Sequence, residues 1–472
     1  QNGTTAIMHM KGAPEVVEKF CNRWLGPDGE QPLDEGMRQR IHEENRYLAS
    51  QGFRVLAVAS RDVPKKEVVD EKLRDFTGDM LFMGLVGLMD PPRPEAREAI
   101  KLCRKAGIQV KMITGDQPET AKAVAHELGL DRRVVTGIEL DKIPEDQLAD
   151  EMERLDVFAR VSPEHKVKIV KALKSKGHVV AMTGDGVNDA PALKGADIGV
   201  SMGITGTEVA KEASSMVLTD DNFATIVRAV KEGRGIYDNI VKFVRFQLST
   251  NLGAIFTVLS ALLLGLPEPF NPIQILWINI IMDGPPAMSL GVDPAADDVM
   301  ERPPRDPVDR ILKFQRLLRL VFFGIVMTVG SLGVMIHILQ SGPAGAETEL
   351  RAATMSFTTF VFFQFFNAFN ARSETGTTFN HLFFTNRALW GSLSAVITLQ
   401  VLAMNLPFLR EVFHTTALSL EDWLLTIGAA SSILVLEEAR KLLVLVWRKL
   451  NPPPEPPPVN TEEGTFKPLR RS

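Results

Sequence analysis

The second half of the chain contains six long apolar stretches, and these constrain its fold more than any other feature. They cover residues 243–265, 272–291, 320–339, 355–370, 388–406 and 423–447. Each is close to the ~20 residues that a helix needs to cross the hydrocarbon core of a bilayer. Helices of this length in soluble proteins normally carry a polar stripe, which argues against buried helices of a large soluble protein. The sequence therefore predicts an all-α membrane domain of six helices over residues 238–450.

Basic residues alternate between the loops that connect these stretches. Lys242 and Arg245 precede the first stretch, the loop before the third carries several arginines, and residues 340–350 carry no basic residue. Because basic loops stay on the cytoplasmic side, both ends of the chain are expected in the cytoplasm. The cell membrane is the expected location, although an internal eukaryotic membrane also fits. The proline-rich residues 451–472 are expected to form a disordered cytoplasmic tail.

The preceding residues, 1 to about 237, are rich in charge and alternate between two patterns. Strand-like runs at 81–88, 109–113, 157–159, 178–182 and 214–218 are separated by helical patterns at 94–106, 119–128 and 163–175. This alternation predicts a parallel α/β sheet with crossover helices. The mean hydropathy of +0.03 is thus the average of a polar and an apolar half, and the net charge of -5 does not suggest a nucleic-acid partner. Two cysteines exclude a disulfide scaffold and a cysteine-rich metal site.

Two of the predicted strands are followed by the same residues, TGD. The first TGD occupies 114–116, and the second begins the run TGDGVNDAPAL at 183–193. A single TGD is weak evidence because glycine and aspartate are common in turns, but ligands of such sheets bind beyond the strand ends. Glycine allows close approach of a phosphate, and the carboxylates of Asp185 and Asp189 are hard ligands suited to Mg²⁺. Lys166, one short helix upstream, supplies a cation for phosphoryl charge.

These motifs, together with KGAPE (11–15), DPPRPEA (90–96) and ARVSPEHK (159–166), resemble a P-type cation-transporting ATPase. The resemblance implies a haloacid-dehalogenase-like phosphorylation domain over 90–237, preceded by the C-terminal part of an α+β nucleotide-binding domain over 1–89, with Asp90 at their junction. It implies ATP and Mg²⁺ as cofactors. The residues that it assigns are Asp185 for Mg²⁺; Thr114, Gly115, Asp116, Lys166, Asn188 and Asp189 for the phosphoryl group; and Lys11, Gly12, Arg61 and Arg160 for the nucleotide.

Three motifs of that family do not occur in this sequence: DKTGT with the nucleophilic aspartate, TGE of the actuator domain, and a PEGL-like ion-binding stretch. Without the nucleophile, the chain as given cannot form an aspartyl phosphate. The expectation is that it is the C-terminal part of a longer protein. Its partner would then be an N-terminal half with the actuator domain, the first four membrane helices and the DKTGT segment.

The second apolar stretch contains the polar residues Asn279 and Asp283, followed by Gly-Pro-Pro at 284–286. Their spacing places both on one face of an α-helix, and polar groups at membrane depth suggest an ion pathway. The prolines would interrupt the helix and free backbone carbonyls, which is a common way to build a cation site. Oxygen ligands of these kinds suit Ca²⁺ or Mn²⁺ better than a soft metal.

Residues 274–294 are similar to calcium pumps, and most similar to the secretory-pathway type that carries Ca²⁺ and Mn²⁺. Ala254 and Gln364 stand where pumps with two ion sites have glutamates, and Met288 stands where the secretory-pathway pumps have a glutamine linked to Mn²⁺. The resemblance therefore implies one Ca²⁺ per cycle, with Asn279 and Asp283 as ligands, and it supports Mn²⁺ less well. Alternatives left open are a pump for Na⁺ or another monovalent ion, a membrane-tethered phosphatase and a non-catalytic nucleotide-sensing membrane protein.

Overall fold

The computed structural model describes residues 5–51, 53–64, 78–88, 92–130, 133–374 and 376–451. Two compact units are present, Gln1–Lys231 with Asp297–Val308, and Glu232–Ala296 with Asp309–Ser472. The predicted domain boundary at 237/238 lies close to the division at 231/232, but 297–308 groups with the first unit although it was predicted within the membrane domain. Asp90 and the predicted tail, apart from Asn451, lie outside the described residues.

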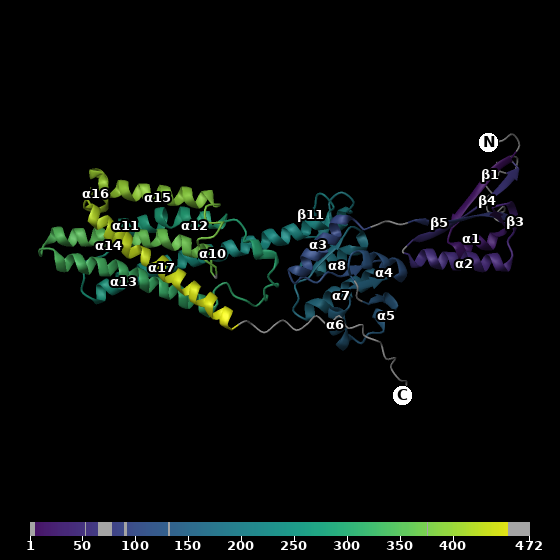
Figure 1. The fold of residues 1–472 in the computed structure, drawn as a ribbon, viewed down its shortest axis with the longest axis horizontal. Coiled ribbons are helices and arrows are strands. Elements are labelled where there is room, and N and C mark those ends of the chain that lie inside the picture. The colour runs from purple at the N-terminus through teal and green to yellow at the C-terminus, as the bar shows by residue number, and fades with distance from the viewer. Residues whose placement is uncertain are drawn as a thin grey trace, which may run out of the picture. The chain divides into compact units, whose positions relative to one another are not determined.

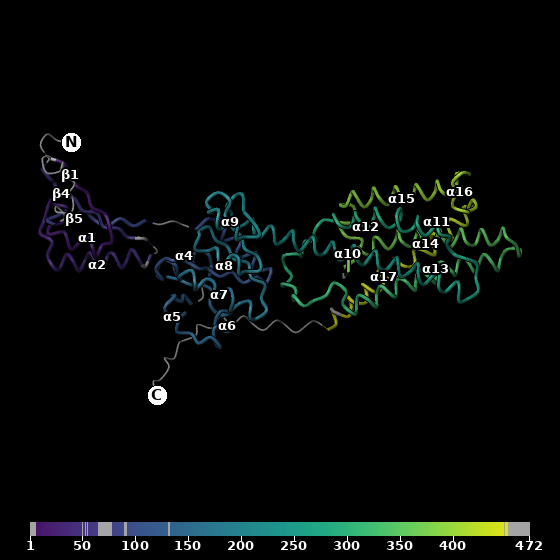
Figure 2. The backbone as a smooth tube through the Cα atoms, turned by 180° about the vertical axis from the view of Figure 1, so that it is seen from behind, coloured from purple at the N-terminus to yellow at the C-terminus, as the bar shows by residue number. Residues whose placement is uncertain are grey.

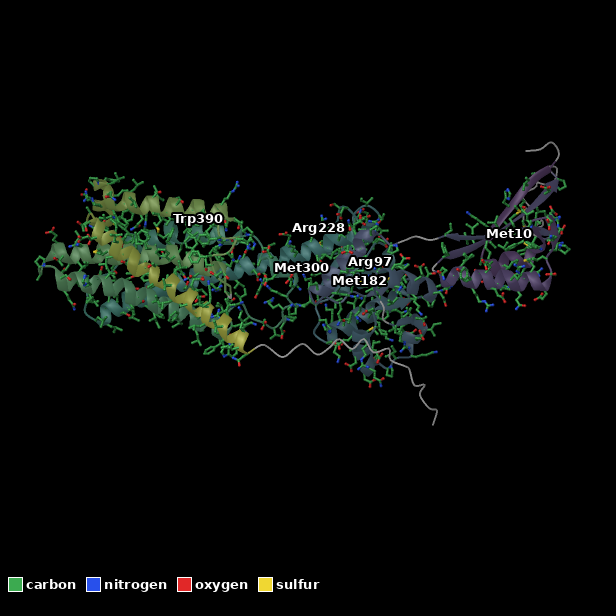
Figure 3. The ribbon with its side chains drawn as sticks, viewed as in Figure 1. Met10, Arg97, Met182, Arg228, Met300 and Trp390 are labelled. Atoms are coloured by element: carbon green, nitrogen blue, oxygen red, sulfur yellow. The ribbon has the colours of Figure 1, made fainter. Side chains whose placement is uncertain are left out.

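The first unit begins with a five-stranded sheet in the order β1-β4-β5-β2-β3, accompanied by helix α2 (Figure 1). Its core contains buried Ala57, Ala59 and Phe82, and Met10 (Figure 3) packs against them. Asp34 caps α2 by accepting a 2.8 Å hydrogen bond from the amide of Met37. The elements are β1 (Thr5–Gly12), α1 (Pro14–Val17), η1 (Glu18–Phe20), β2 (Cys21–Gly26), β3 (Gly29–Pro32), α2 (Glu35–Ser50), β4 (Arg54–Pro64) and β5 (Met80–Leu88).

The strand predicted at 81–88 forms as β5, but its place in the parallel α/β sheet was wrong. It pairs antiparallel with β4 and parallel with β2, within the mixed sheet. The residue pattern of a strand indicates that it is extended and partly buried, whereas its pairing partner depends on the surrounding fold.

The predicted parallel α/β arrangement is confirmed in the remainder of the first unit. Two three-stranded parallel sheets have the orders β6-β8-β7 and β11-β10-β9. Strands β7 and β10 were not predicted, and β6 is shorter than expected. The elements are α3 (Pro94–Lys105), β6 (Met112–Ile113), α4 (Pro118–Glu127), β7 (Val134–Thr136), α5 (Gly137–Asp141), α6 (Glu145–Arg154), β8 (Val157–Ala159), α7 (Pro163–Ser175), β9 (Ala181–Gly184), η4 (Val187–Asp189), α8 (Ala190–Gly195), β10 (Ile198–Met202), α9 (Glu208–Ala213) and β11 (Met216–Leu218).

Apolar packing connects the strand ends that precede the two TGD sequences. Ile113, the last residue of β6, packs against a cluster that contains Phe158 of β8 and also against a cluster that contains Met182 of β9. Helix α7 contributes to both clusters through Ile169 and Val170, which are almost fully buried. The carboxyl ends of β6 and β9 are therefore held over a shared core.

The second unit is helical, and its helices run beside one another in both views of the backbone (Figures 1 and 2). Among the described residues, three helices are long and apolar enough to cross a membrane: α10, α13 and α15. The predicted number of six spans stays a prediction. The elements are α10 (Phe223–Leu263), α11 (Pro272–Trp277), η5 (Ile278–Met282), α12 (Gly284–Gly291), η6 (Asp297–Met300, grouped with the first unit), α13 (Phe314–Ser341), α14 (Ala346–Arg372), α15 (Arg387–Asn405), α16 (Pro407–Phe413) and α17 (Leu420–Leu450).

Candidate functional site

Lys166 and Asp189 form the centre of the predicted phosphoryl site. Lys166 projects from α7, and its Nζ donates to Oδ1 of Asp189 at 2.5 Å. The other carboxylate oxygen of Asp189 accepts hydrogen bonds from the amides of Asp185, at 3.2 Å, and Gly186, at 3.1 Å. Burial raises the pKa of the Asp189 carboxyl, but these hydrogen bonds outweigh burial and hold the pKa below its usual value. The carboxylate is therefore ionised, and it fixes both the lysine and the loop after β9.

Gly184 makes this arrangement possible because a side chain at that position has no room. A Cβ built on Gly184 would lie 2.5 Å from Cβ of Asp189. By contrast, a Cβ on Gly186 would lie 3.6 Å from the nearest atom, an oxygen of Asp189, which is an ordinary contact. The second TGD thus needs its glycine for close packing against Asp189.

The first TGD forms a compact turn after β6. The hydroxyl of Thr114 donates to a carboxylate oxygen of Asp116 at 2.7 Å. The backbone carbonyl of Asp116 accepts from the amide of Arg160 at 3.1 Å. Arg160 follows β8 with a positive φ of 52°, a left-handed conformation that is uncommon for arginine. Thr114, Asp116 and Arg160 are therefore brought together at adjacent strand ends, while Gly115 has open space around its Cα.

Asp185 and Asn188 have exposed side chains, as a ligand-binding role requires. The backbone of Asp185 is fixed on both sides, because its carbonyl accepts from the amide of Thr207 at 2.8 Å and its amide donates to Asp189. Within the described residues, no three His, Cys, Asp or Glu side chains group as a metal site. The exposed carboxylate of Asp185 is a hard oxygen ligand that fits Mg²⁺, and it would be one part of such a site.

Asp221 also organises this region, and the sequence analysis missed it. Its carboxylate accepts from the amides of Gly203, Ile204 and Thr205 at 2.7, 3.0 and 2.8 Å, which fixes the loop after β10. The hydrogen bond from Ile204 has the largest effect, and together these donors lower the pKa of Asp221 to about 2 despite the opposing effect of burial. The pair of aspartates at 220–221 after a strand was the available signal.

The residues assigned to the nucleotide lie in the five-stranded sheet, apart from Arg160. Lys11 and Gly12 end β1, and Arg61 lies in the neighbouring antiparallel strand β4. Arg61 pairs with Met8 in register, whereas Lys11 pairs with Val58. Residues that pair across neighbouring strands point to the same face of a sheet, so Arg61 shares a face with Met8. Lys11 and Met8 are an odd number of residues apart in one strand, so the Lys11 side chain points to the opposite face. Lys11 is exposed, and Arg61 donates a hydrogen bond to the carbonyl of Gly78.

In the helical unit, Asp283 is fully buried between three helical segments. Gln364 of α14 donates to Oδ1 of Asp283 at 3.0 Å, and the hydroxyl of Thr250 in α10 lies 3.0 Å from Oδ2. Both partners are neutral, so they do not balance a buried negative charge. The side-chain oxygen of Gln364 is also buried and has no hydrogen-bond partner among the described residues. This arrangement favours a cation beside Asp283.

The backbone before Asp283 departs from an α-helix. Residues Ile278–Met282 form one turn of π-helix, in which the amide of Asp283 donates to the carbonyl of Ile278 at 3.0 Å. Asn279 is exposed while Asp283 is buried, so the Asn279 side chain is not enclosed together with Asp283 in this structure. The expected interruption of the helix at Pro285 and Pro286 does occur, because these residues have no N–H group to donate to the carbonyls of the preceding turn.

A second buried carboxylate, Asp293, follows α12 and was not identified from the sequence. Lys242 donates to it at 2.7 Å, Arg372 at 3.1 Å, and Asn386 at 2.9 Å. These partners come from α10, the end of α14 and the residue before α15. The carboxylate thus connects three helices, and its partners are too distant in the sequence for any local pattern to reveal them.

Two protein families match separate parts of the chain. The family described as "Cation transporting ATPase, C-terminus" matches residues 267–443, and the family "haloacid dehalogenase-like hydrolase" matches residues 10–197. The calcium-transporting ATPase of Bacillus subtilis is 46% identical over 425 residues, which are 89% of this chain and 47% of the relative. Human calcium-transporting ATPase type 2C member 1 is 44% identical over 444 residues, 93% of this chain and 46% of the relative.

The same extent of similarity is found in a yeast relative. Calcium-transporting ATPase 1 of Saccharomyces cerevisiae is 42% identical over 442 residues, which are 92% of this chain and 46% of that protein. The chain thus spans about half the length of the curated relatives that it matches. Its parallel α/β sheets with two TGD strand ends, followed by apolar helices around a buried aspartate, are in keeping with these matches. Over most of its length, the chain is similar to P-type Ca²⁺-transporting ATPases.

Proposed function

We propose that this chain supplies the phosphoryl-handling and ion-binding residues of a pump that uses ATP to export Ca²⁺ from the cytoplasm through an aspartyl-phosphate intermediate. The observation that carries the proposal is Asp283, a fully buried carboxylate between helices whose two hydrogen-bond partners are neutral. A buried charge without a charged partner is costly, and a bound cation would compensate it. The names of the relatives identify Ca²⁺ as the cation to test.

Ca²⁺ is the proposed cargo, and the oxygens around Asp283 are its proposed ligands. The Asp283 carboxylate, the unpaired oxygen of Gln364 and the hydroxyl of Thr250 are all hard donors. Asn279 is the other proposed ligand; its side chain is exposed in this structure, so it would have to turn towards Asp283 to contact the same ion. One carboxylate is consistent with one Ca²⁺ per cycle. Mn²⁺ is a weaker second cargo, because the exposed Met288 offers only a thioether.

At the phosphoryl site, the proposed roles follow from which groups are already paired. The hydrogen bond to Asp189 holds the Lys166 ammonium in one position, so it can contact phosphoryl oxygens without a change of side-chain conformation. Asp185 would hold Mg²⁺, which supplies neutralisation of phosphoryl charge when bound. Thr114 and Asn188 would donate hydrogen bonds to the same group, with Gly115 and Asp116 shaping the turn. Lys11, Gly12, Arg61 and Arg160 are the proposed contacts for ATP.

The proposed setting is a membrane, with both ends of the chain in the cytoplasm and the cell membrane as the location. The three apolar helices and the loop charges support this placement. The rest of the pump, including the nucleophilic aspartate, would come from a segment preceding these residues, and membrane lipid would surround α10, α13 and α15.

The test is phosphorylation by radiolabelled ATP, and ATP hydrolysis, in membrane vesicles that contain the full-length protein. Micromolar Ca²⁺ is expected to stimulate both, and Asp283→Asn is expected to abolish the Ca²⁺ dependence because it removes the buried charge. Asp306→Asn is the control, since Asp306 is an exposed carboxylate in the loop before α13. Stimulation by Na⁺ but not by Ca²⁺, or unchanged Ca²⁺ dependence in Asp283→Asn, would contradict the proposal.

A further inference from the structure

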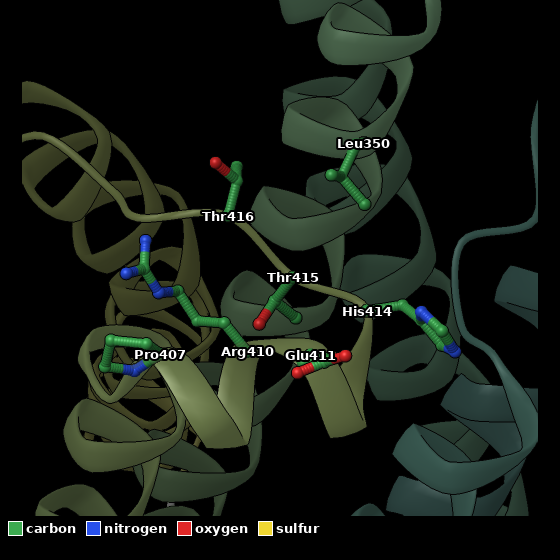
Figure 4. Close-up of a pocket in the computed structure, with 7 residues that line it drawn as sticks. All are labelled: Leu350, Pro407, Arg410, Glu411, His414, Thr415 and Thr416. Carbon is green, nitrogen blue, oxygen red and sulfur yellow. The ribbon is translucent and has the colours of Figure 1, made fainter.

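A cavity of about 360 Å³ in the helical unit is lined by α16, by the three residues that follow it and by one residue of α14 (Figure 4). Its polar side chains do not converge, since the Arg410 guanidinium extends away from the Thr415 hydroxyl and the His414 ring points away from Arg410. Side chains do converge in the first unit, where His165 lies next to Lys166 in the first turn of α7.

The imidazole of His165 is hydrogen-bonded through both of its ring nitrogens. Nδ1 accepts a 2.9 Å hydrogen bond from the amide of Ser162, the residue that precedes α7. Nδ1 therefore carries no proton, and the N–H at Nε2 donates to Oδ2 of Asp141 at 3.0 Å. This hydrogen bond is the main reason why the pKa of the Asp141 carboxyl lies below its usual value. The ring thus connects the start of α7 to the last residue of α5, with only 14% of the His165 side chain exposed.

Gly137, the first residue of α5, gives the imidazole room to occupy this position. A Cβ on Gly137 would lie 2.7 Å from Cε1 of His165, 2.8 Å from its Nδ1 and 2.7 Å from the carbonyl oxygen of Arg160. Non-bonded atoms in a packed core do not approach one another this closely, so any larger residue would displace the ring or the Arg160 backbone. Helix α5 therefore packs directly against the segment that contains Arg160, His165 and Lys166.

These contacts affect Lys166 because it belongs to the first turn of α7. The first amides of a helix have no intrahelical partner, so the first turn opens more readily than the rest of the helix. His165 supplies an acceptor for the amide of Ser162, which is what the third residue of a helix does in a capping box. The same segment is held to the first TGD turn, because the amide of Arg160 donates to the carbonyl of Asp116 at 3.1 Å.

We propose that His165 is a positioning residue for phosphoryl transfer and that Asp141 acts through it. His165 holds the first turn of α7 in place, and this turn carries the Lys166 ammonium that contacts Asp189. This role rests on the proposed function of Lys166 at the phosphoryl site. His165 itself does not contact the phosphoryl group, because both of its ring nitrogens are used in hydrogen bonds within the protein.

The test is the rate of phosphorylation by radiolabelled ATP, measured with the full-length protein in membrane vesicles at saturating Ca²⁺. His165→Ala is expected to lower the maximal rate roughly tenfold to a hundredfold, because a small displacement of a catalytic group has an effect of this size. The ATP concentration that gives half the maximal rate is expected to change little, because the proposed ATP contacts in the five-stranded sheet are untouched.

His165→Gln is the conservative variant, and it is expected to restore the rate to within about threefold of the parent, because a glutamine at this helix position also accepts from the amide of Ser162. His178→Ala is the matched control. His178 pairs with Glu153 at 2.9 Å, beyond the other end of α7, and its substitution is expected to leave the rate unchanged.

Asp141→Ala separates positioning from folding, because the Asp141 side chain is 60% exposed. It is expected to lower the maximal rate by about threefold alone and to cause no further loss when combined with His165→Ala, since Asp141 acts through the imidazole. Lys168 also lies 3.7 Å from the Asp141 carboxylate, and Lys168→Ala is expected to leave the rate unchanged.

Two outcomes distinguish this role from the proposed function. A parental rate in His165→Ala, with Lys166→Ala inactive, would overturn the role of His165 and leave the proposed function standing. A parental rate in Lys166→Ala would overturn the proposed function of that lysine and the role of His165 with it. Rates in His165→Gln as low as in His165→Ala, or additive losses from His165→Ala and Asp141→Ala, would also overturn the positioning role.

Discussion

Replacing Asp189 by asparagine tests the central arrangement of the phosphoryl site. The carboxylate accepts three hydrogen bonds, from Lys166 at 2.5 Å and from the amides of Asp185 and Gly186 at 3.2 and 3.1 Å. Hydrogen bonds to a charged group contribute about 1.5–3 kcal/mol each. Asparagine keeps the shape and one acceptor oxygen, but its NH₂ group must face either the ammonium or the two amides, which are donors themselves.

The expected cost of Asp189→Asn is therefore about 3 kcal/mol for the local structure, which corresponds to roughly a hundredfold in the opening equilibrium. The assay is hydrogen exchange measured by mass spectrometry on the full-length protein. The amides of Asp185 and Gly186 are expected to exchange about a hundred times faster, because they exchange when the loop opens.

Asp197→Asn is the matched control for this experiment. Asp197 also accepts from a lysine and a backbone amide, Lys174 and Val180, at the other end of β9. Its substitution is expected to speed exchange at Val180 and to leave the loop after β9 unchanged. The reasoning is refuted if Asp189→Asn changes exchange in that loop less than threefold, or if Asp197→Asn changes it equally.

Three further predictions follow from the packing and the charges. The pKa of the Asp221 carboxyl is lowered from 3.8 to about 2. The ionised carboxylate therefore stabilises the loop at residues 203–205 above pH ~4, and this stabilisation is lost as the pH falls towards ~2. Asp221→Asn is expected to flatten this pH dependence, as measured by hydrogen exchange of residues 203–205. Gly184→Ala is expected to abolish phosphorylation and lower the melting temperature, whereas Gly186→Ala, which has room for a methyl group, is expected to change neither by much. Asp293→Asn removes the buried carboxylate that pairs with the half-buried Lys242 and Arg372, and it is expected to destabilise the helical unit by about 2–3 kcal/mol. The exposed Asp298→Asn is expected to cost less than about 1 kcal/mol, and thermal unfolding in detergent measures both variants. Equal melting temperatures of the last two variants would contradict the role given to Asp293.

Local features of the sequence were sufficient for much of the phosphoryl site. The helical pattern at 163–175 predicted α7, and the TGD sequences marked the ends of β6 and β9. Such signals work because strand ends in a parallel sheet face one edge, and because glycine is needed where backbone and side chain pack closely. Lys166 and Asp189 were both named from the sequence, and the structure places them in contact.

Other features depend on residues that are distant in the chain. Strand β5 has the residue pattern of a strand, but only the fold decides that it joins β4 and β2. The four-residue spacing of Asn279 and Asp283 predicted one shared helical face, but only the fold decides that Asp283 is enclosed between helices while Asn279 is exposed. Residue spacing does not indicate which segments pack against each side of a helix.

By itself, the sequence determined that the chain has a polar α/β part and an apolar helical part, and it singled out Asp185, Asp189 and Asp283 as candidates but not Asp221 or Asp293. Both conclusions rest on the order of residues along a short segment, which local geometry converts directly into strands, turns and helices. Only the tertiary structure decided what surrounds those aspartates: Lys166 against Asp189, Gln364 and Thr250 against Asp283, and the cations around Asp293. The reason is physical, because burial and hydrogen bonding depend on which segments pack together, and no local pattern records that choice.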